Sequence, residues 1–274
     1  MAQDLGERVM HDLLRILASD AKNGIKLNQG LNLLARYRAR EIGACLYSSG
    51  GAEVRSGPFQ GMKIYGKTSE GNVAPKLLGS YKQELHEIIE RCIETPYECV
   101  VNVGCGDGFY AIGFARRMPT CEIRAYDLNE GRQAYCKAMA EENGVGERVA
   151  VGSNCGVEEL TAVADRRVLV VCDIEGGERE LLDPQLIPAL KQFDILVELH
   201  EVLDKALPKE ILARFDDSHE IENIAHQGRD PNAFEELQKI GQFDQWLAVW
   251  EGRQGPTPWA FIRAKSHMTK SHMK

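Results

Sequence analysis

Residues 100–115 read VVNVGCGDGFYAIGFA, which is an apolar, β-rich run, a turn with alternating glycines, and a helical run. The glycines at 104, 106 and 108 allow a tight turn in which a ligand can approach the N-terminus of the helix closely. The dinucleotide fingerprint GxGxxG would need a glycine where Phe109 stands. The stretch therefore predicts a ligand site between a strand and a helix, and its spacing argues against a nicotinamide cofactor.

Strands alternate with helices from residue 81 onward. Helical patterns separate five expected strands, at 98–103, 121–127, 147–152, 166–173 and 193–200. Such alternation predicts an α/β fold with a doubly wound, mostly parallel sheet, right-handed crossovers and helices on both faces. Near the C-terminus, antiparallel strands are expected at the edge of this sheet, at 220–226, 246–253 and 259–265.

Composition and periodicity divide the chain into four parts. They are a helical extension (1–47), a Gly-rich loop or lid (48–80), the α/β domain (81–264) and a disordered tail (265–274). Two apolar stripes at helical spacing predict the extension, and Gly24 and Asn28 are expected to break it. The loop is too long for an ordinary connection, and long ordered loops tend to be functional.

Charge and hydropathy exclude several classes of partner. The 274 residues carry 33 Lys and Arg against 41 Asp and Glu, a net charge of −8. An acidic surface repels phosphate backbones, so no nucleic-acid partner is expected. No apolar run approaches the ~18 to 20 residues of a membrane span, and the N-terminus lacks the apolar region of a signal peptide. We therefore expect no membrane partner and a soluble, cytoplasmic protein.

The glycine turn resembles motif I of the class I S-adenosylmethionine (SAM) methyltransferases, which has the spacing GxGxG. The resemblance implies the Rossmann-like fold of that class and SAM as the cofactor. Asp127 follows at the end of the second expected strand, where a carboxylate can accept hydrogen bonds from both ribose hydroxyls.

A second motif lies at the end of the fourth expected strand. Residues 170–183 read VVCDIEGGERELLD and resemble the D-[IV]-E-G-x-E segment of the FkbM-like methyltransferases, while GSYKQEL at 79–85 resembles the segment before their first strand. Together the motifs imply a set of cofactor-binding residues: Tyr81, Glu84, Gly104, Cys105, Gly106, Asp107, Gly108, Asp127, Leu128, Asn154 and Asp173.

Three side chains are candidates for the chemistry. Glu198 and His200 alternate along the fifth expected strand, and Asp173 ends the neighbouring fourth. His200 is a candidate general base, oriented by Glu198 or Asp173. Alternatively, the three residues are the ligands of a divalent metal that acidifies an acceptor hydroxyl. A plain hydrogen-bonded pair of Glu198 and His200 is the structural alternative to both.

The sequence thus predicts a SAM-dependent methyltransferase, and the FkbM resemblance implies O-methylation of a small-molecule or carbohydrate-like acceptor. A nicotinamide-dependent oxidoreductase on the same kind of sheet is the alternative enzyme. A catalytically silent SAM-fold protein, used for binding or assembly, is the alternative of another class. The N-terminal helices are a candidate interface for a homo-oligomer.

Overall fold

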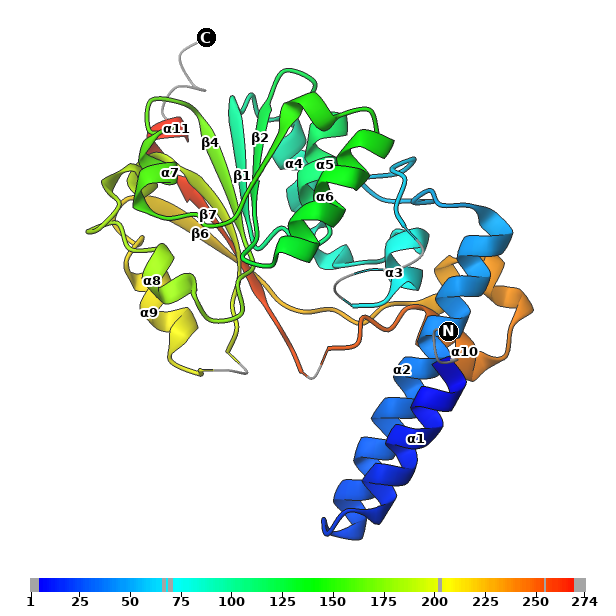
Figure 1. Ribbon diagram of the computed structural model, residues 1–274. Coiled ribbons are helices and arrows are strands. Elements are labelled where there is room, and N and C mark those ends of the chain that lie inside the picture. The colour runs from blue at the N-terminus through cyan, green and yellow to red at the C-terminus, as the bar shows by residue number, and fades with distance from the viewer. Residues whose placement is uncertain (1–4, 66–67, 69–70, 202–203, 254, 269–274) are drawn as a thin grey trace.

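The computed structural model describes residues 5–65, 68, 71–201, 204–253 and 255–268. Its centre is a seven-stranded sheet in the order β3-β2-β1-β4-β5-β7-β6 (Figure 1). The strands are β1 (Cys99–Val103), β2 (Glu122–Tyr126), β3 (Val149–Gly152), β4 (Val168–Cys172), β5 (Asp194–Glu198), β6 (His219–Ile224) and β7 (Trp259–Ala264).

The first five strands are parallel, and β7 runs antiparallel to both β5 and β6. Every residue of β1, β4 and β5 is buried, as expected for parallel strands that are covered on both faces. The order and the reversed seventh strand confirm the predicted fold, a Rossmann-like fold of the class I methyltransferase type.

Helices cover both faces of the sheet (Figure 1). One apolar cluster joins the sheet to α4 (His86–Glu94), α5 (Phe109–Arg117) and α6 (Glu130–Glu142). The other joins it to α7 (Val157–Thr161), α8 (Glu178–Leu181) and α9 (Leu207–Ala213). Short 3₁₀ turns lie at Gln83–Leu85, Gly146–Arg148, Pro188–Gln192, Pro231–Ala233 and Glu235–Lys239.

The N-terminal extension is a helical hairpin of α1 (Leu5–Ala18) and α2 (Asn23–Gly50), which projects from the α/β body (Figure 1). The predicted break between two helices is present, but it lies at residues 19–22, and Gly24 and Asn28 both lie inside α2. A glycine costs a helix only about 1 kcal/mol, which the packing of such a long helix outweighs. The far end of α2 is buried against the body at Ala39, Ile42 and Leu46.

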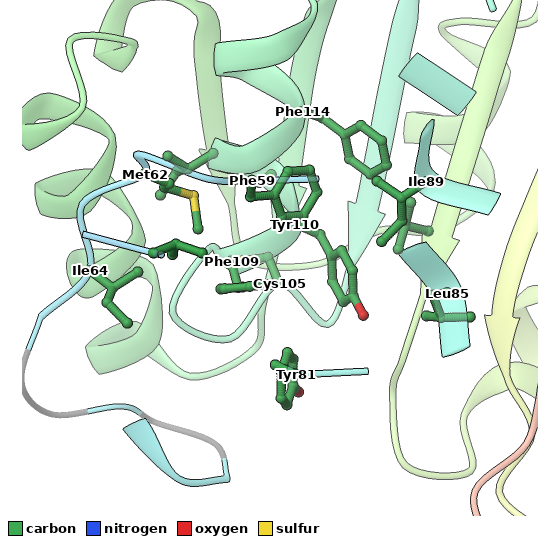
Figure 2. Close-up of a cluster of buried hydrophobic side chains, with 14 of the residues drawn as sticks. Phe59, Met62, Ile64, Tyr81, Leu85, Ile89, Cys105, Phe109, Tyr110 and Phe114 are labelled. Carbon is green, nitrogen blue, oxygen red and sulfur yellow. The ribbon is translucent and has the colours of Figure 1, made fainter. Parts of the chain in front are cut away.

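The segment after α2 is irregular, as predicted, but it is packed against the core, and α2 ends at Gly50 rather than at the expected boundary of 47. Phe59 lies edge-on to Phe109 and Phe114, with ring centroids 5.5 Å apart in each case (Figure 2). Met62 is fully buried, and residues 73–78 form a helix, α3 (Val73–Leu78). This part of the expected lid is therefore a fixed wall of the core; residues 66, 67, 69 and 70 lie outside the described residues.

Two predictions for the C-terminal part are also wrong. Residues 246–253 are not a strand: α10 (Gln242–Ala248) covers their first three residues, because Leu247 and Ala248 pack into the core from a helix. The expected disordered tail begins with a short helix, α11 (Lys265–Met268), while 269–274 lie outside the described residues. No helix in the described part of the chain is long and apolar enough to span a membrane.

Candidate functional site

Two cavities meet at the carboxyl ends of the parallel strands. The larger, of about 510 Å³, is lined by residues that follow β1, β2, β3 and β4. The smaller, of about 360 Å³, lies beside the ends of β4 and β5. Asp173 and Glu175 line both cavities. The site can therefore hold two ligands side by side, with these two carboxylates between them.

The predicted cofactor residues divide into three groups. Five line the larger cavity: Gly104, Asp127, Leu128, Asn154 and Asp173. Tyr81 lines the smaller cavity. The other five, Glu84, Cys105, Gly106, Asp107 and Gly108, are not among the residues that line either one.

The glycine turn has the strained geometry that only glycine accepts easily. Gly104 has a φ of 76°, and a Cβ added there would lie 1.8 Å from the carbonyl oxygen of Asp173. Gly106 has a φ of 54°. The turn from β1 therefore passes directly against the end of β4, which brings both motifs of the sequence to one place.

The Asp127 side chain forms a hydrogen bond with the backbone of this turn. Its carboxylate accepts hydrogen bonds from the backbone N–H of Gly106 at 3.0 Å and from that of Asn129 at 2.9 Å. The guanidinium of Arg132 lies 3.6 Å from it. A buried carboxylate at the edge of the larger cavity is thus already held in place before any ligand binds.

Two of the predicted cofactor residues form ion pairs with other side chains of the protein. Asp107 is buried and accepts hydrogen bonds from Lys76 Nζ at 2.8 Å and from the Thr68 hydroxyl. Glu84 pairs with Arg229, whose guanidinium also contacts Glu251 at 2.6 Å. Their predicted contacts with a cofactor stay predictions, but each carboxylate is held by a partner within the protein.

Lys82 is the central residue of the smaller cavity, and the sequence motifs did not single it out. Its ammonium lies 2.7 Å from Asp173 Oδ2 and 2.8 Å from Glu198 Oε2. It also lies 4.4 Å from the centre of the Trp259 ring. Burial would lower the pKa of Lys82, but the charges of Asp173 and Glu198 outweigh this effect and raise it well above its usual value. Lys82 is therefore a permanent cation.

Backbone strain marks the same place. Among the described residues, Lys82 (φ 46°) and Glu175 (φ 54°) are the non-glycine residues with positive φ. Both line the smaller cavity. Such conformations cost roughly 1 to 3 kcal/mol and cluster at functional sites, so the strain supports a functional role for this cavity.

His200 is held by a buried carboxylate behind it. Its Nδ1 lies 2.8 Å from Glu178, which is fully buried. Its Nε2 faces the cavity, 3.5 Å from both Asp173 and Glu175. Burial would lower the pKa of His200, but the hydrogen bond and charge of Glu178 outweigh it and raise this pKa to about 9. The imidazole is therefore mostly charged at neutral pH, which is unfavourable for the predicted general base.

Asp173 and Glu198 differ in their protonation although they share one cation. Burial raises the pKa of Asp173 to about 7, against the opposing charge of Lys82. Burial acts in the same direction on Glu198, but Lys82 and Arg253 outweigh it and hold the pKa of Glu198 below its usual value. Asp173 is thus the carboxylate that can gain and lose a proton near neutral pH.

The predicted metal ligands do not fit a divalent ion well. Lys82 already lies between Asp173 and Glu198 and supplies the positive charge that a metal would bring. A second trio, Asp173, Glu175 and His200, offers ligand atoms within 4.8 Å of one another. A metal there would need a neutral imidazole, whereas Glu178 favours the charged form. The geometry favours the internal ammonium.

Several solved methyltransferases resemble this fold at low identity. A putative O-methyltransferase from Klebsiella pneumoniae matches with 8% identity and a TM-score of 0.46, over 84% of this chain and 89% of that chain. The O-methyltransferase from Bacillus cereus in complex with SAH matches with 10% identity and a TM-score of 0.45, over 84% and 91% of the two chains. The Streptomyces achromogenes O-methyltransferase involved in tomaymycin synthesis, in complex with SAM, matches with 11% identity and a TM-score of 0.44, over 83% of this chain and 89% of that chain.

Neither a protein-family profile nor a curated protein matches the chain. Because identities and TM-scores this low carry no functional information, the function has to be inferred from the chain's own site.

Proposed function

We propose that this protein is a SAM-dependent O-methyltransferase of the FkbM-like type, acting on a hydroxyl group of a small or carbohydrate-like acceptor. The observation that carries the proposal is the pair of adjoining cavities with Asp173 between them. Methyl transfer needs a cofactor and an acceptor held in contact, together with a group at their junction that can take a proton.

The larger cavity has the properties that SAM requires. Its volume of about 510 Å³ falls in the usual range of ligand sites, about 300 to 1,000 Å³. Leu128 is 79% exposed and Val157 is 51% exposed, and both line this cavity. Exposed apolar side chains at a cavity suit the faces of a purine ring, and the Asp127 carboxylate suits ribose hydroxyls.

When bound, SAM supplies an activated methyl group on a sulfonium, which is ready for in-line displacement. The acceptor hydroxyl would lie in the smaller cavity and lose its proton to the Asp173 carboxylate. As the new O–C bond forms, the electrons of the broken C–S bond remain on sulfur, so that the products are a methyl ether and a neutral thioether.

Lys82 and His200 act on this step through Asp173. Both are cations in contact with or near its carboxylate, at 2.7 Å and 3.5 Å. They fix the orientation of the carboxylate, and the charge of Lys82 opposes the effect of burial on the pKa of Asp173, so that Asp173 remains partly ionised at neutral pH. We assign them positioning roles, while Arg36 and Arg253 provide further cationic groups for the acceptor.

The nicotinamide alternative has less support. Phe109 replaces the last glycine of the dinucleotide fingerprint and is buried at the start of α5, in edge-on contact with Phe59. In dinucleotide-binding folds, a glycine at this position lets the helix pack closely against the strand, and the Phe109 side chain fills that space.

Calorimetry with four ligands tests the proposed function. The protein should bind SAM and S-adenosylhomocysteine, and neither NAD nor NADP. Binding of only the nicotinamide cofactors would overturn the proposal. Binding of SAM without turnover on a broad panel of hydroxylated acceptors would instead support a silent binding module.

Asp127→Ala should weaken SAM binding about tenfold or more. Hydrogen bonds to a charged group contribute about 1.5 to 3 kcal/mol, and the variant also releases the N–H of Gly106 from its acceptor. Calorimetric titration measures the loss, with Asp127→Asn as the control that keeps one acceptor oxygen. An unchanged dissociation constant in folded Asp127→Ala would remove Asp127 from the site.

A further inference from the structure

The α1–α2 hairpin leaves large apolar side chains in solvent. Within the described residues, most of the large apolar side chains that are exposed lie in this hairpin: Met10, Leu14, Leu17, Ile25, Leu27, Leu31 and Leu34. No residue of α1 is buried. Contiguous exposed apolar surface on a protein usually marks an interaction site.

Six of these side chains lie on one side of the hairpin. Gly30 faces Leu13, because a Cβ at Gly30 would lie 3.2 Å from Leu13 Cδ1. Relative to Leu13, the offsets along the chain are −3 for Met10, +1 for Leu14 and +4 for Leu17. Relative to Gly30, they are again −3 for Leu27, +1 for Leu31 and +4 for Leu34.

Because the offsets are equal, the apolar stripe of α1 and that of α2 lie on the same side of the hairpin. At 3.6 residues per turn, the three offsets span roughly 40° to 100° around the helix from the contact line. In two antiparallel helices, the same rotation from the contact line leads to the same side of the pair. The six residues therefore form one apolar surface, the hairpin face, whose members are 44% to 67% exposed.

The body of the protein holds the hairpin in a fixed direction. Arg36 of α2 donates a hydrogen bond to the Gly252 carbonyl at 3.0 Å and lies over the Trp250 ring. Two residues further on, Arg38 pairs with Asp244 of α10 at 2.5 Å. The hairpin face is thus presented to solvent by an anchored arm.

We propose that the hairpin face is a homodimer interface, in which two copies of this chain pair their hairpins into a four-helix bundle. A surface without charged members is complementary to itself, and a two-fold axis lets each copy cover the other's leucines. A helix normally buries its apolar side against another layer of helices, and a second hairpin would supply that layer. The face is two helices wide, and its six side chains span about 11 Å along each helix axis. Together with the polar residues around it, it would form an interface near the lower end of specific interfaces, roughly 600 Å² per partner.

The charges favour a second copy over a membrane surface. Helices that lie on membranes have a polar side rich in Lys and Arg. From Glu7 to Lys26 the hairpin carries a nearly balanced set of charges: Glu7, Asp12 and Asp20 against Arg8, Arg15, Lys22 and Lys26. Further along α2, Arg36 and Arg38 are held against the body of the protein. Asp12 and Arg15 pair with each other at 3.2 Å.

Sedimentation velocity of the full chain with light scattering tests this proposal. The wild-type protein should have twice the chain mass of 30.6 kDa. Leu14→Glu/Leu31→Glu should be monomeric, because it places two charges in each half of the bundle. Ile25→Glu is the matched control: Ile25 is 50% exposed but lies on the other side of α2, so this variant should remain a dimer.

A monomeric wild-type protein, or a dimer that survives Leu14→Glu/Leu31→Glu, would overturn the proposal. So would a monomer that co-sediments with phosphatidylserine vesicles through the same leucines. Circular dichroism and ligand-binding calorimetry show whether each variant is folded. If the double variant unfolds, the milder Leu31→Gln should still raise the dimer dissociation constant at least tenfold while Ile25→Gln leaves it unchanged.

Discussion

Asp173→Asn should lower the turnover number about 10²- to 10⁴-fold, the usual contribution of a positioned general base. The amide cannot accept the acceptor's proton, yet it has the same shape and keeps an oxygen toward Lys82. The affinity for SAM should therefore change only a few-fold. Steady-state kinetics and calorimetry on one protein preparation measure the two quantities. Asp165→Asn, at an exposed aspartate before β4, is the matched control and should be fully active.

The pH dependence separates Asp173 from His200 as the base. A base works in its deprotonated form, so activity is present above its pKa and is lost as the pH falls through it. With Asp173 as the base, activity should fall with a midpoint near its raised pKa of about 7. With His200 as the base, the midpoint should lie near 9. A midpoint near 9, together with an active Asp173→Asn variant, would transfer the role to His200.

Lys82→Met should destabilise the protein by about 3 to 5 kcal/mol, the cost of leaving a buried charge without its partner. Methionine fills a similar volume but leaves Asp173 and Glu198 buried without the ammonium that contacts both. Chemical denaturation monitored by circular dichroism measures the loss. The double variant Lys82→Met/Glu198→Gln should recover part of it, because it removes one of the two carboxylates that lose the ammonium, although Arg253 still lies 3.1 Å from Glu198 in the single variant.

Chelation distinguishes this internal cation from a metal. If Lys82 supplies the positive charge, EDTA should change neither the stability nor the activity of the wild-type protein. Loss of activity with EDTA and its return with a divalent ion would contradict that assignment and restore a metal to the site. Destabilisation well below 1 kcal/mol in Lys82→Met would mean that the two carboxylates do not depend on the ammonium.

Local pattern was sufficient to predict the five parallel strands and two of the carboxylates that line the larger cavity. The strands at 99–103 and 168–172 are short apolar runs, and the glycines after β1 allow the positive φ angles of the turn that follows. Asp127 and Asp173 were found because each follows a strand directly. The carboxyl ends of parallel strands meet at one edge, so their position along the chain was enough to place them together.

Only tertiary structure could decide segments whose local pattern fits two states. The run 246–253 begins with five apolar residues, which fits a buried strand or a helix, but its first three residues belong to the helix α10, because Leu247 and Ala248 reach the core from a helical turn. Residues 48–65 have the glycines of a loop, yet Phe59 and Met62 anchor them in the core. Packing against distant residues decided the helix in the first case and the buried position of an irregular segment in the second.

The smaller cavity depends on contacts that sequence spacing does not record. Lys82 meets Asp173 and Glu198 across 91 and 116 residues of chain. Glu178, packed behind His200, raises the pKa of that histidine and so changes its expected role. Sequence alone placed the chemical groups at the strand ends; the tertiary structure decided which of them are charged, because charge depends on burial and on the nearest partner in space.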